Sequence, residues 1–263
     1  MTQSDGLDQP SLEVVGSAAL DRFIETFNSR DARAWAASLS YPHVRVSPRQ
    51  HTGASATEGD YAEAVSYEAA HDMGWDHSAW DSKQILAVSP AKIHASAQWC
   101  RYDAAGERIL TNDVSYVITR VSGRWGVQAR FGVDSPPPDD ASAAAGTARG
   151  ALTRLLEALA AGAAGDVDPV VRFPFHVVGT GEVHSAASPD ELLAHLGEAG
   201  ATTGDITPLQ VGRRGVNLGV ALTRAGSHRL HGLFLVSLHD ATPRVAAASL
   251  LPDPAVRDSG RPS

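Results

Sequence analysis

Proton transfer at neutral pH is the chemistry that His43 could perform, because an imidazole titrates at about pH 6.5. Tyr41 stands two residues before it, and His94 lies in a later strand-like stretch. Either residue could orient the imidazole or exchange a proton with it. We therefore take His43, Tyr41 and His94 as candidate catalytic residues. In the alternative interpretation, His43 is a strand histidine whose ring nitrogens bond to the backbone or to water.

Polar side chains recur at alternate positions of three predicted strands, and alternate residues of a strand share one face. Arg130 could hold a carboxylate or an oxyanion, or it could pair with Asp113. If the polar stripes converge, they line a pocket; if they face outward, they form a hydrated sheet surface or a contact between domains. Trp75 could form part of a lid. The candidate ligand-binding residues are Arg45, Gln98, Tyr116, Gln128, Arg130 and Trp75.

Other reactive residue types lack the spacing that their chemistry needs. His71 and His77 are six positions apart around Gly74, which fits neither one face of a helix nor one face of a straight strand. Cys100 is the only cysteine and has no nucleophile motif around it. No Gly-rich segment completes a phosphate-binding motif. We therefore expect no metal and no cofactor.

The composition is that of a globular protein. Of 263 residues, 43 % are hydrophobic and 20 % are charged. The 22 Lys and Arg and 30 Asp and Glu give a formal charge of −8, which is the wrong sign for neutralising phosphates, so we expect no nucleic-acid partner. The opening MTQSDGLDQP is acidic and polar, so we do not expect it to be a signal peptide, and no stretch approaches the roughly 18 apolar residues of a membrane span. We expect a cytoplasmic protein without a membrane partner.

The elements that position these residues form an internal repeat. The apolar stripe of one amphipathic helix, Leu20 to Phe27, recurs 132 positions later as Leu152 to Leu159. Tyr41-Pro42 aligns with Phe173-Pro174 at the same offset. His51 meets His184 after one inserted residue. A register shared by three features predicts two copies of one unit.

Each copy places its helices before its strands, which predicts the α+β class. In the first copy we expect a short helix capped by Asp31, a strand over His43–Ser47, a helix from Thr57 to about Ala70, and four further strands. The predicted boundaries are a flexible N-terminus over 1–13, a domain over 14–133, a Pro- and Ala-rich linker over 134–148, a second domain over 149–252, and a flexible C-terminus over 253–263.

This pattern resembles the NTF2-like superfamily, which includes the ketosteroid isomerases and the SnoaL-like proteins. The opening helix over 20–27, the break over 28–32, the Tyr41-Pro42 strand entry and the closing hairpin over 123–127 carry the resemblance. It covers 14–133 well and 149–252 more faintly. It implies two cones, each with helices on a curved antiparallel sheet around a pocket. It also implies that the two halves form an intrachain pseudo-dimer, and it leaves further homo-oligomerisation open.

The sequence departs from the ketosteroid isomerases at their catalytic base. In that family a carboxylate stands at the entry to the first strand, whereas Tyr41 stands there in this chain, and no Asp or Glu lies between Asp31 and Glu58. Two functions stay open. The first cone could be a cofactor-independent acid/base enzyme of the isomerase, dehydratase or ring-opening hydrolase type, acting on a small, partly apolar substrate. Alternatively, it could be a non-catalytic ligand-binding or assembly module.

The second half has lost most of the polar residues that single out the first. The approximate counterparts of His43, His94, Gln128 and Arg130 are Phe175, Asn217, Ala247 and Ser249. We therefore expect the candidate site in the first half and a degenerate second half.

Overall fold

The computed structural model describes residues 9–49, 51–196, 202–224 and 228–252. Its backbone contacts divide the chain into two compact units. The first unit comprises Met1–Val44, Gly53–Arg130 and Thr180–Glu182, and the second comprises Arg45–Thr52, Phe131–Gly179 and Val183–Ser263. We describe each unit separately, and we use "first half" for the elements up to Gly132 and "second half" for those from Ala141 onward.

The first half starts with helices whose ends are fixed by side-chain caps. The Asp31 carboxylate accepts hydrogen bonds from the backbone N–H groups of Arg33 (2.9 Å) and Ala34 (3.1 Å), which starts the second helix. Thr57 and Asp60 form a reciprocal capping box at the third. The elements are α1 (Gln9–Asn28), α2 (Ala32–Ala36), β1 (Leu39–Val46), β2 (His51–Ser55), α3 (Glu58–Ala64), α4 (Glu68–His71), β3 (His77–Val88), β4 (Lys92–Tyr102), β5 (Arg108–Val121) and β6 (Arg124–Gly132).

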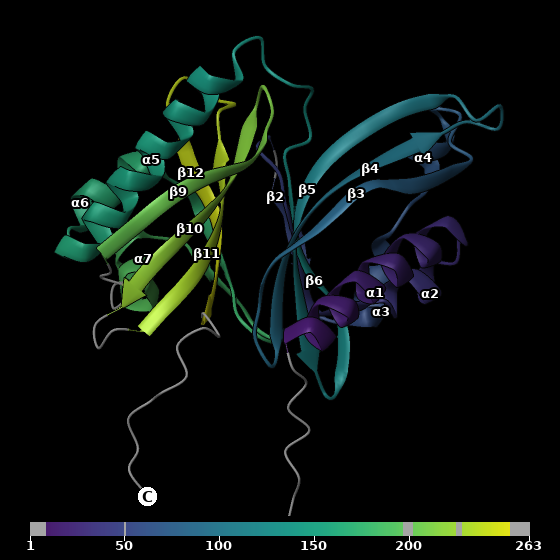
Figure 1. The fold of residues 1–263 in the computed structure, drawn as a ribbon, viewed down its shortest axis with the longest axis horizontal. Helices are drawn as coiled ribbons and strands as arrows, with labels where there is room; N and C mark the ends of the chain where they lie inside the picture. Colours follow the sequence, from purple (N-terminus) through teal and green to yellow (C-terminus); the bar gives the residue numbers. More distant parts are fainter. Residues whose placement is uncertain (1–8, 50, 197–201, 225–227, 253–263) are drawn as a thin grey trace, which may run out of the picture. The chain divides into compact units, whose positions relative to one another are not determined.

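The second half repeats this order, as Figure 1 shows. Asp140 caps the long helix by accepting from the N–H of Ala143 (2.9 Å), and Gly162 ends it with a φ of 64°. The elements are α5 (Ala141–Ala161), α6 (Ala164–Val167), the 3-10 turn η1 (Asp168–Val170), β7 (Val171–Val178), β8 (Val183–Ala186), α7 (Pro189–Leu196), β9 (Thr202–Val211), β10 (Gly215–Arg224), β11 (His228–Ser237) and β12 (Arg244–Pro252).

The two halves form two separate six-stranded sheets with the same strand order. The order is β2-β1-β6-β5-β4-β3 in the first sheet and β8-β7-β12-β11-β10-β9 in the second. The aromatic-Pro bonds at the matching strand entries, Tyr41-Pro42 and Phe173-Pro174, are both cis. The identical topology confirms the predicted tandem repeat of an α+β unit.

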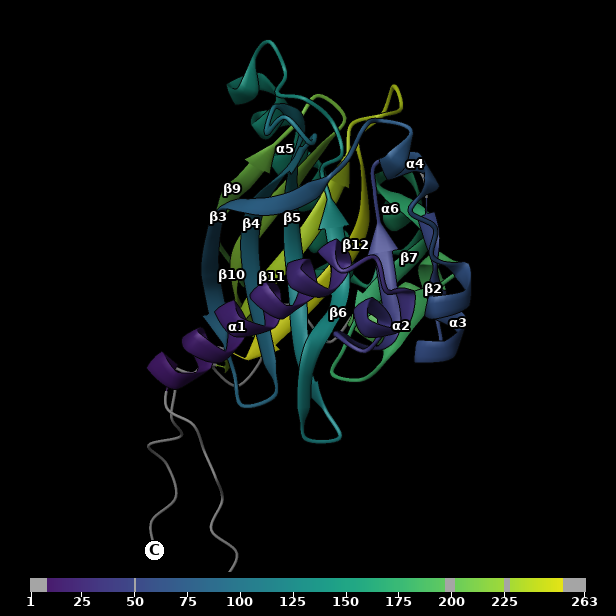
Figure 2. The same ribbon diagram turned by 90° about the vertical axis from the view of Figure 1, so that its right-hand side faces the viewer.

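The helices of each half cover one face of that half's sheet. In the first half α1 lies across β3 and β4, as Figure 2 shows, and α2 packs against α3. The core between them includes Leu20, Trp35 and Tyr116. In the second half α5 packs against β9 to β12, over a core that includes Leu152, Leu155 and Phe175. Burial of these apolar side chains is the main term that holds each layer together.

Several boundaries differ from those that the sequence predicts. The helix expected from Thr57 to about Ala70 is two helices, because Val65 adopts extended backbone and the hydroxyl of Ser66 accepts from the N–H of Glu68. The segment expected as a linker is helical from Ala141 onward. The short strands β2 and β8 were not predicted, since four or five residues give little alternation.

The sheets are mixed rather than purely antiparallel. In the second sheet β7 and β12 run parallel, while the pairs β9–β10, β10–β11, β11–β12 and β7–β8 run antiparallel. The parallel pair arises because β12 ends a meander that starts at the far edge of the sheet and returns beside β7. In the part of the chain that the structure describes, no helix combines the length and the apolar character needed to cross a membrane.

Candidate functional site

His43 is buried on the helix-covered face of the first sheet. Its side chain is 2 % exposed, and its Nδ1 lies 3.1 Å from the carbonyl oxygen of Val127 on β6. Its ring stands edge-on to Tyr61 of α3, with centroids 5.2 Å apart. The imidazole is therefore held by the backbone on one side and by an aromatic ring on the other.

Tyr41 lies on the same face and is held as a neutral hydrogen-bond donor. Its hydroxyl donates to the carbonyl oxygen of Ala36 (2.9 Å). Burial, with further contributions from Tyr61 and Glu58, raises the pKa of Tyr41 well above its usual value of 10.0. A phenol in this state positions the end of α2 and does not release a proton near neutral pH.

His94 lies on the opposite face of the sheet from His43. On β4 the residues Ile93, Ala95 and Ala97 belong to the core beneath the helices, so His94 and its alternate neighbours point the other way. The side chain of His94 is fully buried there. The structure therefore brings Tyr41 and His43 together and separates both from His94.

The predicted binding residues Gln98, Gln128 and Arg130 share the face of His94. On β6 the core residues Trp125 and Val127 alternate with Gln128 and Arg130. The amide of Gln98 donates to the carboxylate of Asp113 (2.9 Å), which is the acid that the sequence offers as a partner of Arg130. The polar stripes thus do not converge with His43.

Gln128 makes three hydrogen bonds within the first unit. Its Oε1 accepts from the Thr119 hydroxyl (2.7 Å) and from the N–H of Gly181 (3.0 Å), and its Nε2 donates to the carbonyl oxygen of Glu182 (3.0 Å). Lys92 lies on the same sheet face, opposite Thr119 in register. Burial lowers the pKa of Lys92 to about 8, although Glu182 opposes the shift.

Tyr116 and Trp75 are core residues, and Arg45 stands apart from them. Tyr116 is fully buried and contacts the rings of Phe23 and Trp80, with centroids 5.7 and 5.8 Å away. Trp75 is 3 % exposed, which does not fit the predicted lid. Arg45 is half-buried near the end of β1. It belongs to the second unit, because the segment of the first unit ends at Val44.

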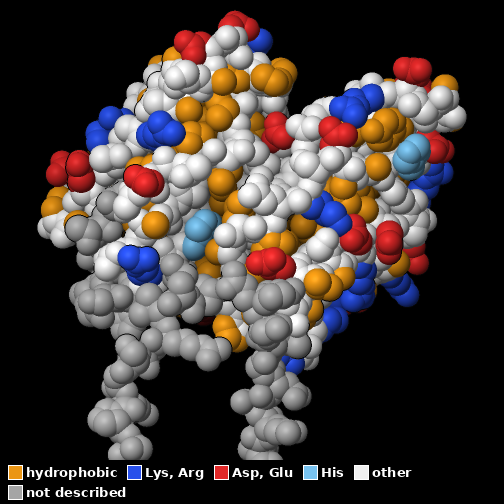
Figure 3. All heavy atoms as spheres, viewed as in Figure 1, with side chains coloured by type: hydrophobic (Ala, Val, Ile, Leu, Met, Phe, Trp, Pro, Cys, Tyr) orange, Lys and Arg blue, Asp and Glu red, His pale blue; other side chains and the backbone are white. Residues whose placement is uncertain are grey.

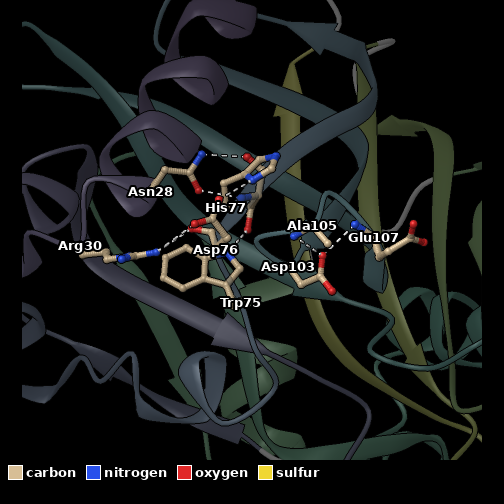
Figure 4. A network of polar contacts seen from close by, with 9 residues as sticks. Asn28, Arg30, Trp75, Asp76, His77, Asp103, Ala105 and Glu107 are labelled. Carbon is tan, nitrogen blue, oxygen red and sulfur yellow. Dashed lines mark hydrogen bonds and ion pairs between the residues drawn. The ribbon is translucent and has the colours of Figure 1, made fainter.

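A polar network fixes Trp75 and the segment that leads into β3 (Figure 4). The indole of Trp75 donates to the Ser78 hydroxyl (3.0 Å), and the backbone of Ser78 is bonded at both N–H and C=O by the Asn28 amide (2.8 Å each). Arg30 donates to the carbonyl oxygen of Asp76 (2.9 Å) and lies 5.1 Å over the Trp75 ring. These contacts give Trp75 a structural role.

The helix-covered face of the first sheet gathers an aromatic cluster that the sequence did not single out as a site. Trp35 contacts the rings of Phe23, Phe27, Tyr61 and Tyr67, with centroids 4.7–5.9 Å apart. Several rings of the cluster are only partly buried. We define the aromatic cluster as Phe23, Phe27, Trp35, Tyr41, Tyr61, Tyr67, Trp80, Trp99, Tyr116 and Trp125.

Three polar atoms in the aromatic cluster are buried without a hydrogen-bond partner among the described residues. They are the indole nitrogens of Trp35 and Trp80 and the hydroxyl of Tyr67. Burial, followed by Tyr61 and Asp31, raises the pKa of Tyr67 to about 12, so its hydroxyl is a neutral donor. The two indole N–H groups are neutral donors by their chemistry. A buried donor left unpaired costs about 1–3 kcal/mol. Sequence periodicity finds the rings but carries no information on their polar atoms.

The second half keeps more buried polar residues than its sequence predicts. Asn217, the counterpart of His94, is fully buried and donates to Gln210 Oε1 (2.7 Å) and to the carbonyl oxygen of Phe131 (2.8 Å). His176 contacts the Ser185 hydroxyl (2.8 Å), and burial, with Arg172, lowers its pKa. Ser249 donates to the carbonyl oxygen of Val178 (3.0 Å).

Metal-ligating residues form no cluster in the described ranges. Acidic and basic side chains are interspersed on the face that Figure 3 shows. Within the described residues, no three His, Cys, Asp or Glu side chains gather closely enough to hold a metal ion.

The same helix-and-sheet unit, with the same strand order, occurs in both halves. The model of a family described as "NTF2-like protein (DUF6841)" matches residues 15–132, so the first half is an NTF2-like domain. No curated protein matches the sequence.

Several solved structures resemble about half of this chain. One is Aln2 from a Streptomyces species, with 19 % identity and a TM-score of 0.39 over 48 % of this chain and 93 % of that one. Another, from Shewanella oneidensis MR-1, is an NTF-2 like protein of unknown function, with 13 % identity and a TM-score of 0.38 over 48 % of this chain and 100 % of that one. A third, from Catenulispora acidiphila in complex with S-DNPA, has 12 % identity and a TM-score of 0.39. It covers 47 % of this chain and 95 % of that one.

Proposed function

We propose that the first unit binds a small, flat, largely apolar molecule at the aromatic cluster and does not transform it. The observation that carries the proposal is the set of three buried donors, on Trp35, Tyr67 and Trp80, that have no partner among the described residues. Buried polar groups in folded proteins are almost always paired. A bound molecule with acceptor oxygens would supply the missing partners.

The geometry favours binding over acid/base catalysis. The sequence offers His94 and Tyr41 as catalytic partners of His43, yet His94 lies on the other face of the sheet and the Tyr41 hydroxyl donates to the carbonyl oxygen of Ala36. Nδ1 of His43 faces the carbonyl oxygen of Val127. We therefore carry forward the non-catalytic interpretation, in which Tyr41 and His43 form one wall of the binding region.

The chemistry of the cluster specifies the class of ligand. Trp and Tyr rings favour flat apolar molecules, which stack on them or meet them edge to face. N–H and O–H donors select acceptor atoms such as carbonyl, ether or hydroxyl oxygens. Some rings of the aromatic cluster, including Phe23, Tyr67 and Trp80, are only partly buried, and such a molecule would meet the donors beside them. The proposed ligand is therefore an aromatic ketone, ether or phenol.

A matched ligand screen tests this proposal. Pairs of flat aromatic compounds that differ by one carbonyl oxygen and contain no other acceptor, such as 9-fluorenone and fluorene, are titrated while tryptophan fluorescence and the melting temperature are followed. We expect the ketone of each pair to bind more tightly, because only the ketone can accept from the buried donors. Equal affinity within every pair, or no binding by any compound, contradicts the proposal.

A further inference from the structure

A separate pocket opens on the surface of the second unit, with a volume of about 510 Å³. It lies where α5, α6 and η1 meet Thr242 of the loop before β12. Pockets that bind small molecules commonly have volumes of roughly 300–1,000 Å³. Small and apolar side chains form part of its lining, among them Ala158, Pro169 and Val170, and three charged side chains join them, namely Arg154, Glu157 and Asp166.

The three charged side chains lack partners within the described part of the chain. No ion pair or side-chain hydrogen bond joins Arg154, Glu157 or Asp166 to any described residue. All three are exposed at the rim of the pocket, so their charge costs little in the free protein. The pocket therefore presents one positive and two negative groups beside an apolar surface.

The corresponding corner of the first half is bridged by hydrogen bonds from two arginine side chains. There the guanidinium of Arg22 donates to the carbonyl oxygen of Ala37 (3.0 Å), and Arg124 donates to the same oxygen. At the offset of 132, Arg154 and Pro169 take the places of Arg22 and Ala37. Among the described residues Arg154 makes no bond of this kind, so its guanidinium is available to a ligand.

We propose that this pocket binds a basic amino acid. The carboxylate of the ligand would pair with the fork of Arg154, and its two cationic groups would pair with Glu157 and Asp166. Its aliphatic stem would lie over Ala158, Pro169 and Val170. One negative and two positive charges on the ligand match the two negative and one positive charges of the pocket, which neither a simple amine nor a simple carboxylate does.

Isothermal titration of the full chain with three related probes tests the proposal. L-arginine carries all three charged groups, agmatine lacks the carboxylate, and L-norleucine lacks the side-chain cation. We expect L-arginine to bind about two- to fivefold more tightly than each of the other two, since each exposed ion pair adds a small gain. No heat of binding for L-arginine at millimolar concentrations, or equal affinity for L-arginine and agmatine, overturns the proposal.

Substitutions assign the binding to this pocket. Arg154→Gln should weaken L-arginine about two- to fivefold and leave agmatine unchanged, whereas Asp166→Asn should weaken both. Arg149→Gln on the same helix and Asp168→Asn beside Asp166 are matched exposed controls that do not line the pocket, and we expect no change in either. L-arginine affinity that is unaltered in both Arg154→Gln and Asp166→Asn contradicts the assignment.

Discussion

The two halves of the chain share a topology but differ in the chemistry of their cores. All five Trp and all five Tyr of the chain lie between Trp35 and Trp125, and none follows in the second half. The core of the second half consists mostly of Leu, Val and Ala, with Phe175 and Phe234 as its fully buried rings. An aliphatic core has no polar atoms to satisfy, whereas an aromatic core of Trp and Tyr does. The comparison shows that one strand order accommodates either kind of interior.

The largest expected effect distinguishes the two cores by cavity formation. Trp35→Ala should lower the free energy of unfolding by about 3–5 kcal/mol, because it deletes the ring on which the aromatic cluster converges. Its counterpart at the offset of 132 is Val167, and Val167→Ala should cost about 1–3 kcal/mol, since it removes far fewer atoms. Chemical denaturation of both variants checks the prediction. Equal losses would show that the aromatic cluster does not organise the first half.

The next effect is a pH dependence that Lys92 confers on the first half. Its pKa is lowered from 10.5 to about 8 in the folded chain, so the unfolded chain binds more protons between these values and stability should rise with pH from about 8 to about 10.5. The gain should approach roughly 3 kcal/mol. Denaturation across this range, in the parent chain and in Lys92→Met, measures it. An identical slope in the two proteins would exclude Lys92 as its source.

Two tyrosine substitutions sharpen the comparison between partnered and unpartnered donors. Tyr41→Phe should destabilise the protein by about 1 kcal/mol, because it removes a donor from the carbonyl oxygen of Ala36. Tyr67→Phe should leave stability unchanged or raise it by about 1 kcal/mol, because it removes a buried hydroxyl with no described partner. Thermal and chemical unfolding decide between these signs. Destabilisation of Tyr67→Phe would mean that its hydroxyl is already paired, for instance with water.

His176 gives the second half a pH dependence with a different origin from that of Lys92. Its pKa lies below the usual 6.5, chiefly because of burial and then because of Arg172. The stability that the neutral ring contributes is therefore full above about pH 6.5 and is lost as the pH falls toward the folded pKa. Denaturation at a series of pH values should show this decline in the parent chain and a weaker one in His176→Gln. A decline that is unaltered by the substitution would assign it to other groups.

The repeat and the order of elements were predictable because both depend on local patterns. Apolar periodicity placed the opening helices, and the aromatic-Pro entries fixed the offset between the halves. The alternation within β4 and β6 was also assigned correctly. Ile93, Ala95 and Ala97 of β4 and Val127 of β6 do belong to one core. These features need no knowledge of what covers each face.

The failure of the candidate site residues to converge was not predictable, because alternation separates two faces without saying which one the helices cover. Residues 114–119 of β5 are buried on both faces, so polarity does not mark one face as solvent-exposed. The pairing of a side chain is set by tertiary neighbours. The contact of Gln98 with Asp113 and the isolation of the Trp35 indole among the described residues therefore have no signature in the sequence.

The affinity of a ketone hit from the matched screen, measured by titration calorimetry in the parent chain and in Tyr67→Phe, tests the central claim most directly. Tyr102→Phe serves as the control, because Tyr102 lies outside the aromatic cluster. Binding at the unpartnered donors predicts about a tenfold loss of affinity in Tyr67→Phe, which corresponds to one buried hydrogen bond, and no loss in Tyr102→Phe. Equal affinity in all three proteins would contradict the claim.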